Sequence, residues 1–147
     1  MDMLKLSHVS KSFGKRQIVK DISFSVPEGT VFGFIGQNGA GKTTTMKMIL
    51  GLLQMDGGEI SVNGKKVRYG QNATNRYIGY LPDVPEFYGF MTPGEYLMLC
   101  GSITGLSKTE CIERRDALLE MVGLKEANKR IHGFSRGMKQ RLGIAQA

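Results

Sequence analysis

The sequence predicts an α/β fold that combines a parallel-sheet core, a set of antiparallel strands and a helical insert. The run VFGFI at 31–35 is short and almost entirely apolar, which is typical of a strand buried on both faces of a parallel sheet. Apolar and polar residues alternate over 22–26, as they do in a half-buried strand. Over 92–123 the apolar residues instead recur at helical spacing.

Strands and one helix account for most of the first eighty residues. Strands are expected over 4–13, 59–62 and 77–81, where apolar residues are bounded by glycine or proline. The Asn-Gly pair at 63–64 is a strong hairpin signal. A helix is expected over 42–53, because the apolar residues there recur at helical spacing.

Capping signals mark the helices of the insert. The Thr-Pro pair at 92–93 combines an N-cap residue with a proline at the first helical position. Ser107 and Glu110 form a capping box for a second helix, which is expected to end near residue 123. Residues 134–137 are expected to form a loop, and the last ten residues another helix.

Composition narrows the classes of function. The formal net charge is +7, but the basic residues are scattered and no aromatic residues interleave with them, so no nucleic-acid partner is expected. No apolar run reaches the roughly 18 residues that a membrane-spanning helix requires.

One motif carries a specific chemistry. Residues 36–43 match G-x-x-x-x-G-K-[ST], a phosphate-binding loop placed between an expected strand and an expected helix. Glycines let the backbone N–H groups converge on an anion, and the helix that follows adds the positive end of its dipole. The candidate phosphate-binding residues are Gly36, Gln37, Asn38, Gly39, Ala40, Gly41, Lys42, Thr43 and Thr44. Lys42 can reach the β- and γ-phosphates of a nucleotide, and the Thr43 hydroxyl can bind Mg²⁺. The loop alone does not name the reaction, because kinases, GTPases, motors and transporters all use it.

The whole chain resembles the ATP-binding subunits of ABC transporters. The loop GQNGAGKTT at 36–44 is spelled much as in that family. Phe13, before a glycine, stands where the family stacks the adenine ring, and Asp83, at the end of YLPD, stands in the glutamine loop. The segment FSRGM at 134–138 stands where the family has its LSGGQ signature.

The resemblance implies further ligands for ATP and Mg²⁺. Phe13 would stack on the base, although by its residue type alone it could equally be a core or edge phenylalanine. Ser135 and Gly137 would contact the γ-phosphate held by the other subunit of a head-to-tail homodimer or heterodimer. From the residues alone, Ser135 is better explained as a plain N-cap.

Two motifs depart from the family pattern. Asp83 replaces the glutamine, so a charged carboxylate takes the place of a neutral amide. The resemblance implies that Asp83 occupies a catalytic and Mg²⁺-binding position and contacts the metal through water. In the signature, Arg136 and Met138 are substitutions, while Ser135 and Gly137 are kept. A similar S-x-G-M-K-Q-R spelling occurs in exporters, which favours export as the direction of transport.

The resemblance also implies a domain organisation. We expect one ABC ATPase domain, with the nucleotide-binding core and β subdomain over 1–82, the helical subdomain over 83–137 and the start of the signature helix over 138–147. The family's Walker B aspartate, catalytic glutamate, D-loop and switch histidine follow that helix. We therefore expect the domain to be C-terminally incomplete, with residues 1–147 binding ATP without efficient hydrolysis.

The function implied is an ATPase that couples ATP binding and hydrolysis to transport by a membrane permease. Such a subunit would be cytoplasmic and held on the inner face of the cell membrane by the permease. Residues 83–93 would contact that permease, unless their apolar side chains simply pack beneath the helical insert. Two alternatives stay open: a soluble ABC-type ATPase acting on nucleic acid or ribosomes, and a binding module without turnover.

Overall fold

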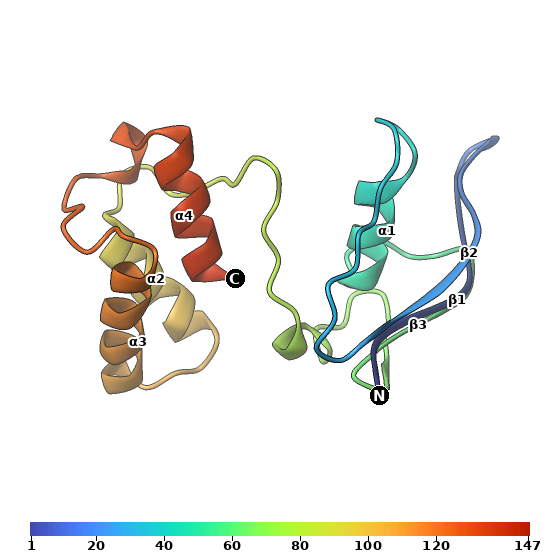
Figure 1. The fold of residues 1–147 in the computed structure, drawn as a ribbon, viewed down its shortest axis with the longest axis horizontal. Helices are drawn as coiled ribbons and strands as arrows, with labels where there is room; N and C mark the ends of the chain where they lie inside the picture. The colour runs from blue at the N-terminus through green and yellow to red at the C-terminus, as the bar shows by residue number, and fades with distance from the viewer. The chain divides into compact units, whose positions relative to one another are not determined.

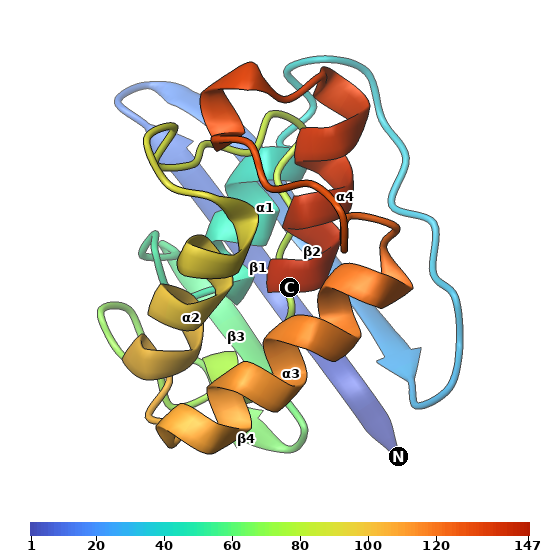
Figure 2. The same ribbon diagram turned by 90° about the vertical axis from the view of Figure 1, so that its left-hand side faces the viewer.

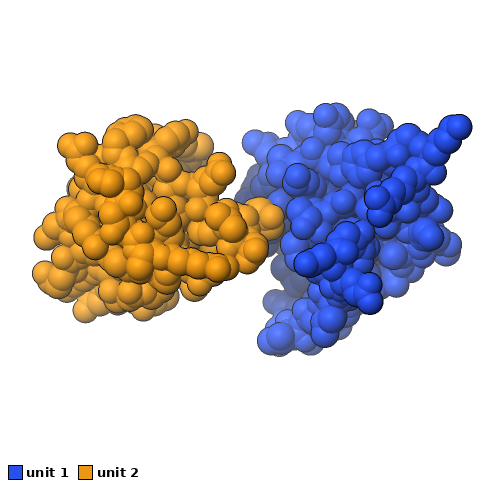
Figure 3. Space-filling model, turned by 90° about the horizontal axis from the view of Figure 1, so that it is seen from above, with its two compact units in different colours: residues 1–78 blue, residues 79–147 orange.

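The computed structural model describes residues 1–147, which form four strands, four α-helices and two short 3₁₀ helices (Figure 1). The chain divides into two compact units, Met1–Ile78 and Gly79–Ala147 (Figure 3). No helix has both the length and the apolar character that crossing a membrane requires.

A four-stranded antiparallel sheet dominates the first unit. Its strands are β1 (Asp2–Phe13), β2 (Arg16–Pro27), β3 (Gly57–Val62) and β4 (Lys65–Lys66), in the order β2-β1-β3-β4. The expected hairpin is confirmed: Asn63 and Gly64 both have positive φ, at 48° and 71°, as a type I′ turn requires. The expected strands at 4–13, 22–26 and 59–62 are confirmed as well.

The short helix α1 (Lys42–Ile49) and the sheet share the core of the first unit. The buried residues of this core are Leu6, Val9, Val19, Met48, Ile60, Val62 and Val67. The helix ends before residue 53, where the sequence pattern had placed its end. Gly51 has a φ of +71° and its N–H donates to Met48 O at 3.1 Å, so a left-handed glycine stops the helix.

The strand expected over 31–35 is not formed. Val31 and Ile35 are almost fully exposed, at 103% and 94%, and no strand pairs with this segment. An apolar run becomes a buried strand only where neighbouring strands accept and donate its backbone hydrogen bonds. Here Phe32 stacks on Phe24 of β2 instead, with ring centroids 5.0 Å apart.

The strand expected over 77–81 is also absent. A 3₁₀ helix, η1 (Asn75–Tyr77), occupies its start. Tyr77 N donates to Thr74 O at 3.1 Å and Ile78 N donates to Asn75 O at 3.0 Å. These local bonds satisfy the backbone where no neighbouring strand is available.

Three helices build the second unit (Figure 2). They are α2 (Pro93–Ile103), α3 (Lys108–Met121) and α4 (Arg136–Gln146), and a 3₁₀ turn, η2 (Ile131–Gly133), precedes the last one. The expected N-cap of α2 and the expected capping box of α3 are both confirmed. The expected loop at 134–137 is too long, because α4 already begins at Arg136.

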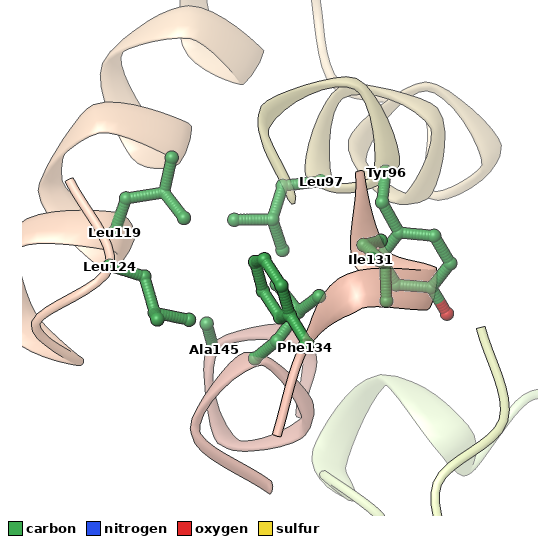
Figure 4. Close-up of a cluster of buried hydrophobic side chains, with 8 residues drawn as sticks. Tyr96, Leu97, Leu119, Leu124, Ile131, Phe134 and Ala145 are labelled. Atoms are coloured by element: carbon green, nitrogen blue, oxygen red, sulfur yellow. The ribbon is translucent and has the colours of Figure 1, made fainter. Parts of the chain in front are cut away.

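The helices of the second unit enclose their own apolar core. Figure 4 shows Leu97 of α2, Leu119 of α3 and Ala145 of α4 turned toward one another. The buried members of this cluster are Tyr96, Leu97, Leu119, Leu124, Ile131, Phe134, Leu142 and Ala145. Each unit therefore has a separate hydrophobic core.

Candidate functional site

The glycine-rich loop lies directly before α1, as the motif predicts. Gly39 and Gly41 have φ values of +85° and +94°, conformations that L side chains rarely adopt. A turn closed by Ala40 N donating to Gln37 O at 3.1 Å brings the two halves of the loop together. Gly41 is the N-cap of α1, so the loop runs into the positive end of the helix dipole.

Gly41 is also required by close packing. A Cβ atom at this position would lie 3.1 Å from the Ile18 carbonyl oxygen and 3.1 Å from Val19 Cγ2. Thr45, itself buried, donates its hydroxyl to Gly41 O at 2.9 Å. The loop is therefore held between β2 and the first turn of α1, which positions its remaining N–H groups.

Lys42 folds back over the loop. Its ammonium donates to the carbonyl oxygens of Gly36 and Gln37, the latter at 2.8 Å. Lys42 is half-buried at the first position of α1, so its side chain follows the path of the loop. An ammonium has three donors, so it can exchange these carbonyls for phosphate oxygens without moving far.

A pocket of about 350 Å³ joins the loop to the end of the first hairpin. Phe13, Lys42 and Thr43 all contribute to it. Its complete lining is Phe13, Arg16, Ile18, Asn38, Gly39, Gly41, Lys42, Thr43 and Thr44. An aromatic ring, two cationic side chains and hydroxyl groups therefore face one cavity, although Phe13 and Lys42 are far apart in the sequence.

Two of these residues were not among the sequence candidates. Arg16 is paired directly with Phe13 across the first hairpin, and Ile18 follows it two residues later in β2. Alternate residues of a strand share a face, so the period of two in β2 was the signal that could have found them. Gly36, Gln37 and Ala40, by contrast, belong to the loop but do not line the pocket.

The remaining candidates lie in the second unit. Ser135 is the N-cap of α4, and its hydroxyl accepts from Met138 N at 3.2 Å. A Cβ atom on Gly137 would have nothing within 4 Å, so the backbone there is open to approach. Asp83 is highly exposed, and its Oδ1 lies 3.8 Å from Arg136 Nη2, so two of the residues that depart from the family pattern form one ion pair. Such an exposed pair adds little stability.

Both the sequence and the fold of the chain are similar to those of known proteins. Residues 19–147 match the ABC transporter family. The chain belongs to this family. Its structure is also similar to a solved ATP-binding subunit of an ABC transporter, with a TM-score of 0.86 and 34% identity, covering 99% of this chain and 61% of that one. The P-loop NTPase fold of the ABC ATPases is thereby confirmed, with its antiparallel sheet and its helical part.

Curated members of the ABC family align with nearly all of the chain. YxlF of Bacillus subtilis, an ABC transporter ATP-binding protein, is 47% identical over 99% of this chain and 48% of its own length. The bacitracin transport ATP-binding protein BcrA of Bacillus licheniformis is 40% identical over 99% of this chain and 47% of its own length. The linearmycin resistance ATP-binding protein LnrL of B. subtilis is 42% identical over 99% of this chain and 47% of its own length. The chain thus spans about half the length of these relatives.

Proposed function

We propose that this ABC family member couples ATP binding and hydrolysis to transport by a membrane permease, and that the direction of transport is export. The observation that carries the proposal is the single pocket in which Phe13 faces the phosphate loop and Lys42. The relatives named for bacitracin transport and for linearmycin resistance support export. So does the signature spelling FSRGMKQR at 134–141.

In this proposal the pocket holds ATP. The Phe13 ring, 51% exposed, offers a face on which a purine can stack. Lys42 and the N–H groups of the loop bind the β- and γ-phosphates, and Thr44 lies beside them in the pocket. Arg16 adds a second positive charge to the same cavity. The size and the charge of the cavity both suit a nucleoside triphosphate.

The residues present also fit Mg²⁺, which prefers oxygen ligands and shares them with phosphates. Thr43 lines the pocket next to Lys42, so its hydroxyl is the proposed metal ligand. For Asp83 the family resemblance alone supports a water-mediated contact with Mg²⁺, and its carboxylate here is in an ion pair with Arg136. When bound, Mg²⁺ neutralises charge on the phosphates.

We further propose that residues 1–147 bind ATP but hydrolyse it inefficiently. Hydrolysis needs a group that orients or deprotonates the attacking water. The lining of the pocket contains hydroxyl, amide and cationic groups but no carboxylate. Efficient turnover would then depend on parts of the family's ATPase domain that these residues do not supply.

The segment 83–93 combines the two roles considered for it. Phe87 and Met91 pack against the core of the second unit, and Phe87 meets Tyr96 edge-on with ring centroids 5.1 Å apart. Val84 and Phe90 remain exposed, at 70% and 63%. We propose these exposed side chains as the contact with the permease, which would hold the protein on the inner face of the membrane.

The signature residues are proposed to act in a dimer. Ser135 keeps a hydroxyl proton to donate, because its oxygen only accepts from Met138 N. Together with the open backbone at Gly137, it forms a donor set suited to a phosphate. In a head-to-tail dimer this set would meet the γ-phosphate held by the other subunit.

The first test measures MgATP binding and hydrolysis on the 147-residue chain and on the protein in its full natural length. We expect both forms to bind MgATP and only the longer one to turn it over efficiently. Lys42→Ala should weaken binding at least about tenfold in both, since charged hydrogen bonds to phosphate are lost. Lys47→Ala, which removes a cation from the other end of α1, is the matched control.

If neither form binds MgATP, the ATP-binding proposal is wrong. Efficient hydrolysis by the 147-residue chain would contradict the proposed dependence on the remainder of the family's domain. Loss of binding in Lys47→Ala as large as that in Lys42→Ala would show that net charge, and not the phosphate loop, holds the nucleotide.

A further inference from the structure

We propose that Lys11 and Asp56 form a clamp that sets the position of the Phe13 ring for stacking on the nucleobase. The inference rests on the proposed ATP site and adds to it two positioning residues outside the pocket. Lys11 Nζ lies 2.8 Å from Asp56 Oδ1 and 5.5 Å from the centre of the Phe13 ring. Neither Lys11 nor Asp56 lines the pocket, whereas Phe13 does.

Asp56 binds the end of β1 at two points. One carboxylate oxygen accepts from Lys11 Nζ, and the other accepts from Ser12 N at 2.7 Å. The backbone N–H of Asp56 donates in turn to Ser10 O at 2.9 Å. The hydrogen bonds from Lys11 and Ser12 lower the pKa of Asp56 below its usual value, because they stabilise the ionised carboxylate.

The clamp lies where the sheet no longer holds this strand regularly. Pairing of β1 with β3 ends at Ser10 and Gly57, three residues before Phe13. Pairing of β1 with β2 is irregular on both sides of Lys11. In a regular sheet, the hydrogen bonds to neighbouring strands set the direction of a strand. Beyond Ser10 the hydrogen bonds to the Asp56 carboxylate set the direction of the end of β1 instead.

The Lys11 ammonium lies over the Phe13 ring, so the two side chains meet on one side of the strand end. The side chain of Lys11 is only 13% exposed, while the ring of Phe13 is 51% exposed. A largely buried ammonium held by a carboxylate is a fixed point, and its attraction to the ring restrains the exposed aromatic side chain. Lys11 is thus expected to act on the nucleotide only through Phe13.

The experiment compares two probes on the full-length protein, MgATP and inorganic tripolyphosphate with Mg²⁺, by calorimetric titration. The ratio of the two dissociation constants isolates the contribution of the base. Lys11→Met should weaken MgATP binding about two- to fivefold, the effect of losing one cation–π contact, and leave tripolyphosphate unchanged. Lys11→Arg should restore the ratio, because a guanidinium can keep both contacts.

Two further variants separate positioning from other effects. In a Phe13→Leu background, Lys11→Met should cause no additional loss, because the ring on which Lys11 acts is gone. Lys15→Met removes an exposed cation from the same hairpin without a contact to the ring, and should leave the ratio unchanged. Asp56→Asn, which keeps the shape of the side chain, should shift the ratio in the same direction as Lys11→Met, by weakening MgATP binding relative to tripolyphosphate binding.

The clamp proposal is wrong if Lys11→Met weakens the binding of both probes equally or has no effect on either. It is also wrong if Lys11→Met still weakens MgATP binding in the Phe13→Leu background. Those results leave the ATP site itself intact. If the wild-type protein binds neither probe, the proposed function fails and the clamp fails with it. The two failures are therefore distinguished by the wild-type titration.

Discussion

At single residues, the phosphate loop depends on two glycines that differ in their surroundings. Both Gly39 and Gly41 have a strongly positive φ. Around Gly39 a Cβ atom would meet nothing within 4 Å, whereas at Gly41 it would meet Ile18 and Val19. The same motif thus uses one glycine for backbone conformation alone and another for conformation and close packing.

This difference predicts unequal effects of two matched substitutions. Gly39→Ala is expected to cost about 1–2 kcal/mol of stability through its left-handed backbone. Gly41→Ala is expected to cost about 1–3 kcal/mol more, because the added methyl group crowds β2. Urea unfolding of both variants measures the two costs, and equal costs would contradict the packing argument.

At the level of elements, the helices of the second unit begin with reciprocal caps. Thr92 and Glu95 form a capping box at α2, and Ser107 and Glu110 form another at α3. Hydrogen bonds from the side chain and the backbone of Ser107 lower the pKa of Glu110. The N–H and hydroxyl of Thr92 likewise lower the pKa of Glu95.

These shifts predict the direction of acid destabilisation. A carboxylate whose pKa is lowered on folding stabilises the protein fully above its unfolded pKa of about 4.3. That contribution is lost as pH falls through the lower folded value. Glu110→Gln keeps a capping side chain that does not titrate. Its urea midpoint should therefore fall less steeply than that of the wild type between about pH 5 and pH 3.

A second glutamine variant provides the control for this titration. Glu113→Gln removes a carboxylate from α3 beyond the cap, and should follow the wild-type slope. If Glu110→Gln shows the wild-type slope as well, the capping box does not contribute to the pH dependence.

At the level of the whole molecule, stability is divided between two separate cores. Leu142 of α4 is fully buried in the second core, while Ile144, two residues later on the same helix, is 58% exposed. The amphipathic character of α4 therefore assigns neighbouring apolar residues to different surroundings.

A pair of alanine substitutions in α4 tests this assignment. Leu142→Ala should destabilise the protein by about 2–5 kcal/mol, because it leaves a cavity. Ile144→Ala should change the stability by less than about 0.5 kcal/mol, as surface substitutions usually do. Hydrogen exchange should speed up in Leu142→Ala mainly within residues 79–147. Faster exchange confined to residues 1–78 would contradict the assignment of Leu142 to the second core.

Local signals in the sequence were sufficient to predict part of this structure. The phosphate loop, the Asn63-Gly64 turn and the helix caps at Thr92 and Ser107 each depend on residues within a few positions of one another. Their physical causes are backbone conformation and short-range hydrogen bonds, which the residue types themselves specify. Elements of this kind were predicted correctly.

Only the tertiary structure decided which residues, distant in the sequence, lie side by side. Whether 31–35 forms a strand depends on partners for its hydrogen bonds, which no local pattern contains. Arg16 reaches the pocket across a hairpin, and Lys11 meets Asp56 across 45 positions of sequence. The sequence thus determined which groups are available to the proposed ATP site. The pairing of distant strands determined which of them face the same cavity, because that pairing depends on contacts summed over the whole fold.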